Sequence, residues 1–190
     1  ITYLFIPNPD LIDGGAFTYC RNLNYVEIGG SVPGAERTGV IETNAFFTDV
    51  GQNVTNAVLK VENKIRTIKS NAFNNNRDWI KYATLASYDI GSSSFANQAN
   101  LIDVYIRDTN KFVRFRAFEN CTSLRDLRIG KWTRQVGDNA FVNCGITGDI
   151  KFRAGVTAGS STLKIYNDAF GGTNNKPRNV YLNGDCLLYT

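Results

Sequence analysis

Apolar residues between Val113 and Ile129 follow a spacing rule that recurs along the chain. Counted from Phe118, they lie at positions −5, −1, 0, +3, +6, +9 and +11. Steps of three place side chains on one edge of a tight helical or 3₁₀ turn, and a final step of two places the last pair on one side of a strand. The pattern therefore predicts a short turn that leads into a short strand.

A phenylalanine marks the centre of each copy of this pattern. Ile or Val stands five residues before it in every copy, and the residue directly before it is Ala in all copies but one, which has Ser94. The steps between successive markers are 29, 27, 22, 23, 23 and 29 residues, so the basic period is near 23. The markers are Phe17, Phe46, Phe73, Phe95, Phe118, Phe141 and Phe170.

These copies predict a repeat solenoid. One copy cannot bury its own apolar side, so we expect the copies to stack, to share a core and to pair their strands in parallel. The expected architecture is mainly β, with a parallel sheet on one face and short helical or 3₁₀ turns opposite. We expect one solenoid domain over residues 1–190, with about seven repeats over 12–182, a partial repeat over 1–11 and a C-terminal cap over 183–190 that contains an Asn-Gly hairpin turn.

The third copy leaves two strand registers open. Either Ala83 and Leu85 or Tyr82 and Thr84 could face the core, and the first pair is favoured because it is the more apolar. Three insertions, over residues 29–39, 47–57 and 154–161, are predicted to be additions to single copies, the first and the last of them as surface loops.

Polar residues and cysteines occupy fixed places in the pattern. Asn44, Asn71 and Asp168 directly precede their Ala-Phe pairs, where such side chains are expected to satisfy free backbone N–H groups at the start of a turn. Cys121 and Cys144 share position +3 of adjacent copies, about one strand spacing apart, which a disulfide could span. The favoured interpretation is that these two cysteines and Cys20 are buried, reduced thiols, with Cys186 the most accessible.

Composition excludes several classes of function. The chain has no histidine, which removes Ser-His-Asp and Cys-His nucleophile systems and His-containing zinc sites. No CxxC pair, apolar run of membrane-spanning length or signal peptide occurs. The net charge of +4 is too mild for a nucleic-acid signature. Methionine is absent, so Ile1 is not a translation start, and we expect a processed form or a fragment of a longer array. We expect no cofactor, no metal site and no enzymatic activity.

The motif I-x4-AF-x2-C-x2-L-x2-L-x-I resembles the leucine-rich repeat of BspA-like (treponemal-type) surface proteins. The resemblance covers residues 12–182 and is strongest over 90–152, with Asn76 and Gln98 departing from it at the Cys position. The resemblance implies a secreted or surface-attached protein of a host-associated anaerobic bacterium or a protist. It also implies adhesion to host proteins or to other cells, and it brings no catalytic residues.

Strand residues that alternate with the core pairs are expected to form the solvent side of the parallel sheet. Tyr and Arg among them are types enriched at protein-contact hot spots. The favoured hypothesis is a noncatalytic module that binds a protein on a host or neighbouring cell surface. A carbohydrate-binding module and an architectural spacer are the alternatives, and a merely solvated face explains the same residues. The candidate ligand-binding residues are Tyr82, Tyr105, Arg107, Asp126, Arg128, Lys151 and Arg153.

Overall fold

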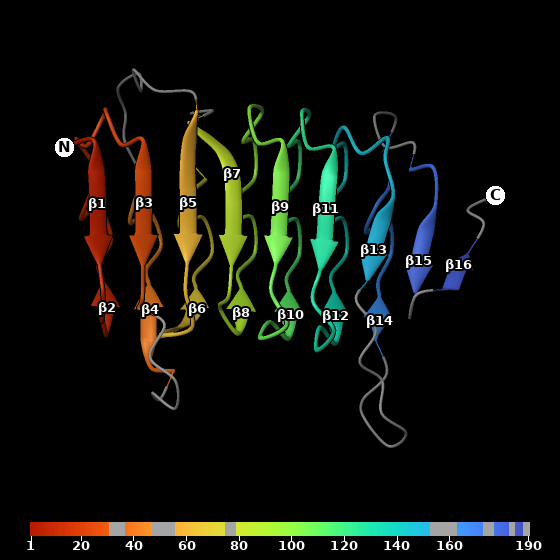
Figure 1. The fold of residues 1–190 in the computed structure, drawn as a ribbon, viewed down its shortest axis with the longest axis horizontal. Coiled ribbons are helices and arrows are strands. Elements are labelled where there is room, and N and C mark those ends of the chain that lie inside the picture. The colour runs from red at the N-terminus through yellow and green to blue at the C-terminus, as the bar shows by residue number, and fades with distance from the viewer. Residues whose placement is uncertain are drawn as a thin grey trace.

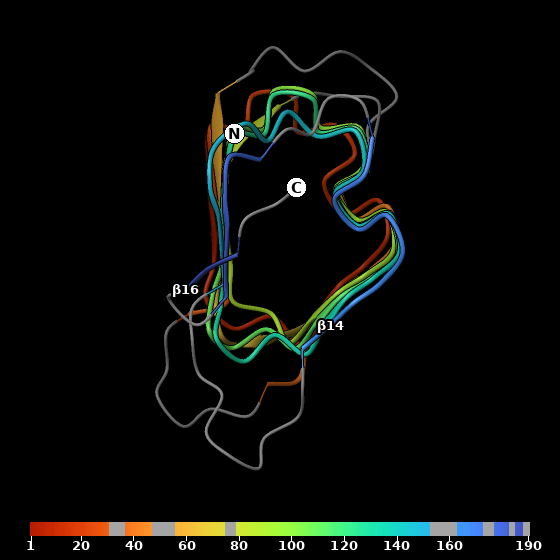
Figure 2. The ribbon, with the colours of Figure 1, turned by 90° about the vertical axis from the view of Figure 1, so that its right-hand side faces the viewer.

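The fold is a β-solenoid in which each copy of the pattern forms one layer (Figure 1). The computed structural model describes residues 1–30, 37–46, 56–74, 79–152, 163–172, 177–182 and 185–187. The chain forms one strand in each of two sheets and then a compact turn before it enters the next copy. Viewed along the array, the copies lie over one another and each traces nearly the same outline, with the first sheet along one side (Figure 2).

The first sheet is the one that the sequence predicts. Its nine strands are hydrogen-bonded in the order β1-β3-β5-β7-β9-β11-β13-β15-β16, and all pairs are parallel except the last. Leu127 pairs with Val104 on one side and with Ile150 on the other, as the predicted register requires. The strands are β1 (Tyr3–Ile6), β3 (Tyr25–Ile28), β5 (Ala57–Val61), β7 (Ile80–Leu85), β9 (Asp103–Ile106), β11 (Asp126–Ile129), β13 (Ile150–Phe152), β15 (Val180–Leu182) and β16 (Asp185–Leu187).

In the third copy, the favoured register is confirmed. Ala83 and Leu85 are buried, whereas Tyr82 is 43% exposed. A register shift between Ala57 and Val58 accompanies the pairing of β5 with β7, which accounts for the irregular pattern in this copy. Tyr82 therefore points to solvent on the face that the candidate residues share.

A second parallel sheet, which the sequence analysis missed, contains the Ile or Val at position −5. Its order is β14-β12-β10-β8-β6-β4-β2. Most of its strands have only two residues, too few for a period-two alternation to be recognised. The strands are β2 (Leu11–Ile12), β4 (Gly39–Ile41), β6 (Ile65–Ile68), β8 (Asp89–Ile90), β10 (Phe112–Val113), β12 (Gln135–Val136) and β14 (Lys164–Ile165).

The third side of the solenoid consists of β-turns, and the described residues contain no helix. The residue two before the Phe marker has positive φ in every copy, between 48° and 74°. This conformation interrupts a 3₁₀ helix and favours Gly, Asn and Asp. Positive φ accounts for Asn44, Asn71 and Asp168 by backbone conformation, a reason that the sequence analysis did not consider, and capping of free N–H groups by their side chains stays a prediction. The residues are Gly15, Asn44, Asn71, Ser93, Arg116, Asn139 and Asp168.

On the turn side, the backbone N–H groups that bond between copies donate forward to the next copy, whereas those in the parallel sheets donate in both directions. In the first sheet, for example, the Ile150 N–H donates forward to the Asn179 carbonyl at 2.9 Å. In the second sheet, the Gly137 N–H donates back to the Val113 carbonyl of the previous copy, at 2.8 Å. On the turn side, the Phe118 N–H donates forward to the Ala140 carbonyl at 2.8 Å, and the Phe141 N–H donates forward to the Ala169 carbonyl at 2.7 Å. Neighbouring copies are thus joined by backbone hydrogen bonds on three sides.

The seven marker phenylalanines form one continuous stack inside the solenoid. Successive ring centroids lie 4.7–5.3 Å apart, with interplanar angles of 3–21°. The five inner rings are buried, and Phe17 and Phe170 at the two ends are partly buried. The stack fixes the distance between copies and confirms that the markers are core residues.

Position +3 supplies a buried donor to the previous copy. The Cys121 and Cys144 thiols contact the carbonyls of Phe95 and Phe118 at 3.3 and 3.2 Å, and the Gln98 amide donates to the Phe73 carbonyl at 2.8 Å. Both cysteines are buried and free, as predicted, but Cys20 is only partly buried because it lies near the first layer. Asn76 and the side chain of Cys186 lie outside the described residues.

An asparagine ladder, which the sequence analysis also missed, follows the turns. Asn120 has a φ of 60°, donates through its side-chain amide to Asn97 at 3.1 Å and accepts from Asn143 at 3.2 Å. The 23-residue spacing of these three asparagines was the available signal.

We expect Asn120→Ala to destabilise the fold more than Asn120→Gly. Both changes remove the side-chain hydrogen bonds, but only Ala is strained at positive φ, by about 1–2 kcal/mol. Equilibrium denaturation of both variants measures the difference. Equal losses would contradict the left-handed conformation of this residue.

The C-terminal end of the array closes with the expected hairpin. Strands β15 and β16 pair antiparallel, with Tyr181 opposite Cys186. The second sheet ends at β14, and Ile165 there is 43% exposed, although its equivalents in the other copies are buried. The insertion over 154–161, and most of those over 29–39 and 47–57, lie outside the described residues.

Candidate functional site

The outer face of the first sheet brings most of the predicted site residues into two neighbouring rows. Register pairing places Tyr82 beside Asp103 and Asp103 beside Asp126. In the second row, Tyr105 pairs with Arg128, which pairs with Lys151 of the next strand. Strand neighbours are separated by about 4.8 Å. Five predicted site residues, Tyr82, Tyr105, Asp126, Arg128 and Lys151, therefore form one contiguous surface over β7, β9, β11 and β13.

Arg128 links the two rows. Its Nη2 donates to both carboxylate oxygens of Asp103, at 2.9 and 3.0 Å, and its guanidinium carbon lies 4.9 Å from the centroid of the Tyr105 ring. The ion pair is solvent-exposed, so it contributes little to stability, roughly 0–1 kcal/mol. Its main effect is to hold the guanidinium over the Tyr105 ring, so that an aromatic and a cationic group present one surface.

Arg107 lies at the edge of this face and pairs across a whole strand. Its Nη1 lies 2.8 Å from Oε2 of Glu62, two copies earlier. Ala86, directly after β7, occupies the copy between them and is buried. Its small side chain leaves room for Arg107 to cross it.

A shallow hollow of about 380 Å³ lies on the same face. It is bordered by Asp103, Asp126, Asp149, Arg128, Lys151 and Leu127. Asp149 continues the carboxylate row, since it directly precedes Ile150, the register partner of Leu127. Asn179 donates its side-chain amide to Asp149 at 3.0 Å. The hollow therefore offers hydrogen-bond acceptors and two cations side by side.

The described part of this face is less positive than the sequence alone indicates. Of the three described cations among the predicted site residues, Arg107 and Arg128 are held in ion pairs. Lys151 is exposed at the border of the hollow, and Arg153 lies outside the described residues. The face therefore presents both signs of charge beside two tyrosines.

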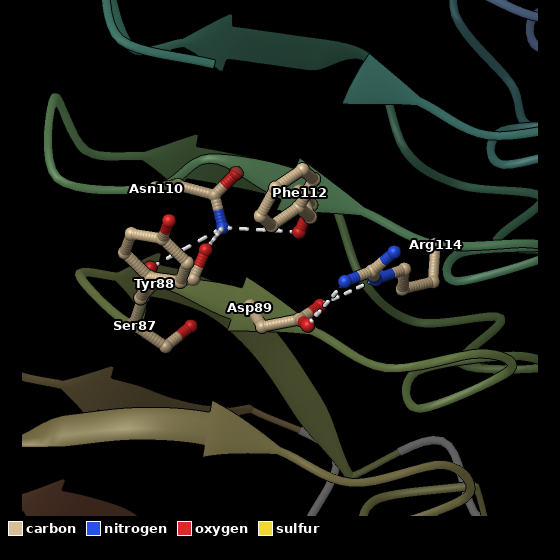
Figure 3. Close-up of polar contacts among 6 residues, drawn as sticks. All are labelled: Ser87, Tyr88, Asp89, Asn110, Phe112 and Arg114. Carbon is tan, nitrogen blue, oxygen red and sulfur yellow. Dashed lines mark hydrogen bonds and ion pairs between the residues drawn. The ribbon is translucent and has the colours of Figure 1, made fainter. Parts of the chain in front are cut away.

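A polar network holds the corner where each layer passes from the first sheet to the second (Figure 3). Asn110 is buried, and its side-chain amide donates to the carbonyls of Ser87, Tyr88 and Phe112 at 3.2, 3.4 and 3.3 Å. One Asn side chain thus fixes the chain direction in two successive copies, and the residue that follows it, Lys111, is held at the surface of the corner.

Arg114 and Asp89 form a bidentate pair beside this network (Figure 3). Nε and Nη2 of Arg114 donate to the two carboxylate oxygens at 2.8 and 2.6 Å. The carboxylate raises the pKa of the Arg114 guanidinium further above its already high value. This pair joins the outer faces of β8 and β10 and leaves little free charge there.

The same corner carries a group of basic and aromatic residues that sequence reasoning missed. Arg37, Tyr88, Lys111, Lys131 and Trp132 surround a hollow of about 570 Å³, together with Asp108 and Thr109. The available signal was the 23-residue spacing of Lys111 and Arg134, each seven residues before its marker. Burial lowers the pKa of the Lys111 amine, and the nearby Arg134 and Arg37 cations lower it further.

Within the described residues, no group of three or more His, Cys, Asp or Glu side chains is arranged to hold a metal ion. A search of the same residues finds no helix that could cross a membrane.

Comparison with known proteins identifies the repeat. A family model described as "BspA type Leucine rich repeat region" matches six copies over residues 1–87 and 88–176. No curated protein matches the chain. Among solved structures, a leucine-rich repeat protein from Bacteroides ovatus is similar, with 15% identity and a TM-score of 0.34 over 93% of this chain. This chain spans 63% of that protein's length. The chain belongs to the BspA-type leucine-rich repeat family.

Proposed function

We propose that this protein is a noncatalytic interaction module, outside the cell or on its surface, that binds a protein through the outer face of the first sheet. The observation that carries the proposal is the contiguous surface of Tyr82, Tyr105 and Arg128 beside a shallow hollow with both signs of charge. Tyr and Arg dominate the energetics of protein interfaces because they combine large contact area with hydrogen-bonding groups. A flat face that extends over several strands suits a macromolecule better than a small metabolite.

Membership of the repeat family supports this proposal because solenoids present extended surfaces for binding. We further propose that the bound protein lies on the surface of a host cell or of a neighbouring cell. The partner that fits best has an acidic, partly apolar patch that meets Lys151 and the Tyr105 ring, with donors that reach the Asp126 carboxylate.

A binding screen tests this proposal. Surface plasmon resonance against purified extracellular-matrix and serum proteins finds the ligand, and the double variant Tyr105→Ala, Arg128→Ala is then compared with the unmodified chain. We expect affinity to fall by at least roughly tenfold, as the loss of two hot-spot residues implies, and to weaken with salt.

The control is Lys111→Gln with Arg134→Gln. This double change alters the basic corner between the two sheets and leaves the outer face of the first sheet intact. Unchanged affinity in the Tyr105/Arg128 variant, with normal melting, would reject the sheet face as the site. A glycan array run in parallel decides between protein and carbohydrate as the ligand of this face. Binding to neither proteins nor glycans would favour the architectural spacer.

A further inference from the structure

Two adjoining hollows run along the corner between the sheets. The larger, of about 570 Å³, is lined by Arg37, Tyr88, Lys111, Lys131 and Trp132, among others. The second, of about 510 Å³, shares Arg37 and Tyr88 with it and extends along the array to Arg66 and Thr38. Together they form a groove across several copies, which we call the corner groove. It lies on a different side of the solenoid from the proposed protein-binding face.

The corner groove is strongly cationic. Arg37, Arg66, Lys111 and Lys131 line it, and Arg134 is close enough to Lys111 to lower its pKa. None of these five cations forms an ion pair with a carboxylate in the described part of the chain. Asp108 is the one acidic residue among the described lining, and one of its carboxylate oxygens accepts the backbone N–H of Lys131 at 3.0 Å. The groove therefore carries an excess of positive charge, which favours an anionic ligand.

The cations follow a regular column. Backbone hydrogen bonds connect Arg66 to Tyr88, Tyr88 to Lys111 and Lys111 to Arg134 in consecutive layers. Each step is one strand spacing, about 4.8 Å. Three of these four successive positions hold a cation, so a linear polymer that lies along the array meets several positive charges in line. The ligand is thus expected to be an extended polyanion and not a single phosphate.

The aromatic rings of the groove argue against nucleobases. Lys111 and Lys131 lie over Trp132 at 4.9 and 5.2 Å from the ring centre, and Arg66 lies over Tyr88 at 5.7 Å. Trp132 is only 36% exposed. Single-stranded nucleic acids gain much of their affinity from stacking on open rings. Here a base would have to displace a cation, whereas sulfate or carboxylate groups can bind the cations where they lie.

We propose that the corner groove binds a linear polysaccharide that carries sulfate or carboxylate groups. The Asn110 network holds Lys111 in place before the ligand arrives, since Asn110 is buried and fixed by three backbone carbonyls. This inference is independent of the proposed protein-binding function, because the residues that carry the two do not overlap.

Heparin is the probe for the test, with neutral dextran and single-stranded DNA as comparison ligands. We expect the chain to bind heparin and not dextran, and Lys111→Gln with Arg134→Gln to lower heparin affinity by roughly tenfold or more. The slope of log affinity against log salt should become shallower by roughly two, one for each lost cation. The charge-conserving pair Lys111→Arg with Arg134→Lys should retain most of the binding.

The matched control is Lys60→Gln with Lys151→Gln, which removes the same charge from the outer face of the first sheet and should leave heparin binding unchanged. A second groove pair, Arg66→Gln with Lys131→Gln, replaces the first pair if thermal melting shows that the first does not fold. Equal heparin affinity in the groove pair and the unmodified chain would overturn the proposal. An equal loss in the control pair, or tighter binding of single-stranded DNA than of heparin, would overturn it as well.

Discussion

Phe118→Ala is expected to lower the free energy of unfolding by about 3–5 kcal/mol. Phe118 is fully buried, and its ring stacks between Phe95 and Phe141, with centroid distances of 5.1 and 4.9 Å. The substitution removes both stacking contacts and leaves a cavity in the middle of the array, where the neighbouring copies cannot close it without moving the sheets. Chemical denaturation measures the loss.

Phe115→Ala is the matched control for this prediction. It removes the same side chain three residues earlier in the same turn, but Phe115 is 44% exposed and contacts Arg116 at 4.7 Å from its ring centre. We expect a loss of less than about 1 kcal/mol. Similar losses in the two variants would show that Phe118 is not part of a buried stack.

Gly130→Ala is expected to destabilise the array by about 1–3 kcal/mol through overpacking. Gly130 directly follows β11, and a Cβ atom there would clash with the Arg107 carbonyl oxygen and lie 2.6 Å from the Asp108 backbone nitrogen. Both atoms belong to the backbone of the preceding copy, so they cannot rotate away as a side chain could. To relieve the clash, the two neighbouring copies must move apart at the corner, and this movement strains the first sheet. Thermal melting measures the change.

Gly148→Ala gives the corresponding control. A Cβ atom at Gly148 would find its nearest neighbour, the Arg125 carbonyl oxygen, at 3.5 Å, which is ordinary van der Waals contact. We expect melting close to that of the unmodified chain. Equal tolerance of alanine at the two glycines would contradict the close approach of the fourth and fifth copies at Gly130.

The first sheet could be predicted because its signal is strong and local. Pairs such as Leu127 and Ile129 alternate with polar residues, so period two and the 23-residue repeat together fix the register. The same logic placed Tyr82 outside and Ala83 inside, on hydrophobicity alone. The fold and the outward direction of the candidate residues therefore follow from the sequence.

The second sheet and the turn conformation could not be derived in the same way. Ile90 and Val113 were recognised as core positions, but each lies in a strand of two residues, and hydrogen bonding to neighbouring copies, not sequence pattern, defines such strands. Asn139 could equally have been a helix cap or a residue with positive φ, because both roles favour asparagine.

The electrostatics of the two surfaces depended on contacts between distant copies. Arg107 pairs with Glu62 only because Ala86 lies between them, and no local rule predicts a pairing that skips a strand. Likewise, Arg37 reaches the corner groove from the copy with the first insertion, where its Nη1 donates to the Thr109 carbonyl at 3.4 Å. On this repeat surface, the sequence therefore predicts which side chains point to solvent better than it predicts which charges stay unpaired.

Amide hydrogen exchange, followed residue by residue by NMR, tests most directly whether the copies are joined on three sides. Both proposed surfaces require this arrangement, because it sets the register of their rows. The structure predicts that the Phe95, Phe118 and Phe141 amides, bonded forward to the next copy, are protected as strongly as the Leu127 amide of the first sheet. Exchange of these three amides near the rates of an unfolded chain, with the sheet amides still protected, would contradict it.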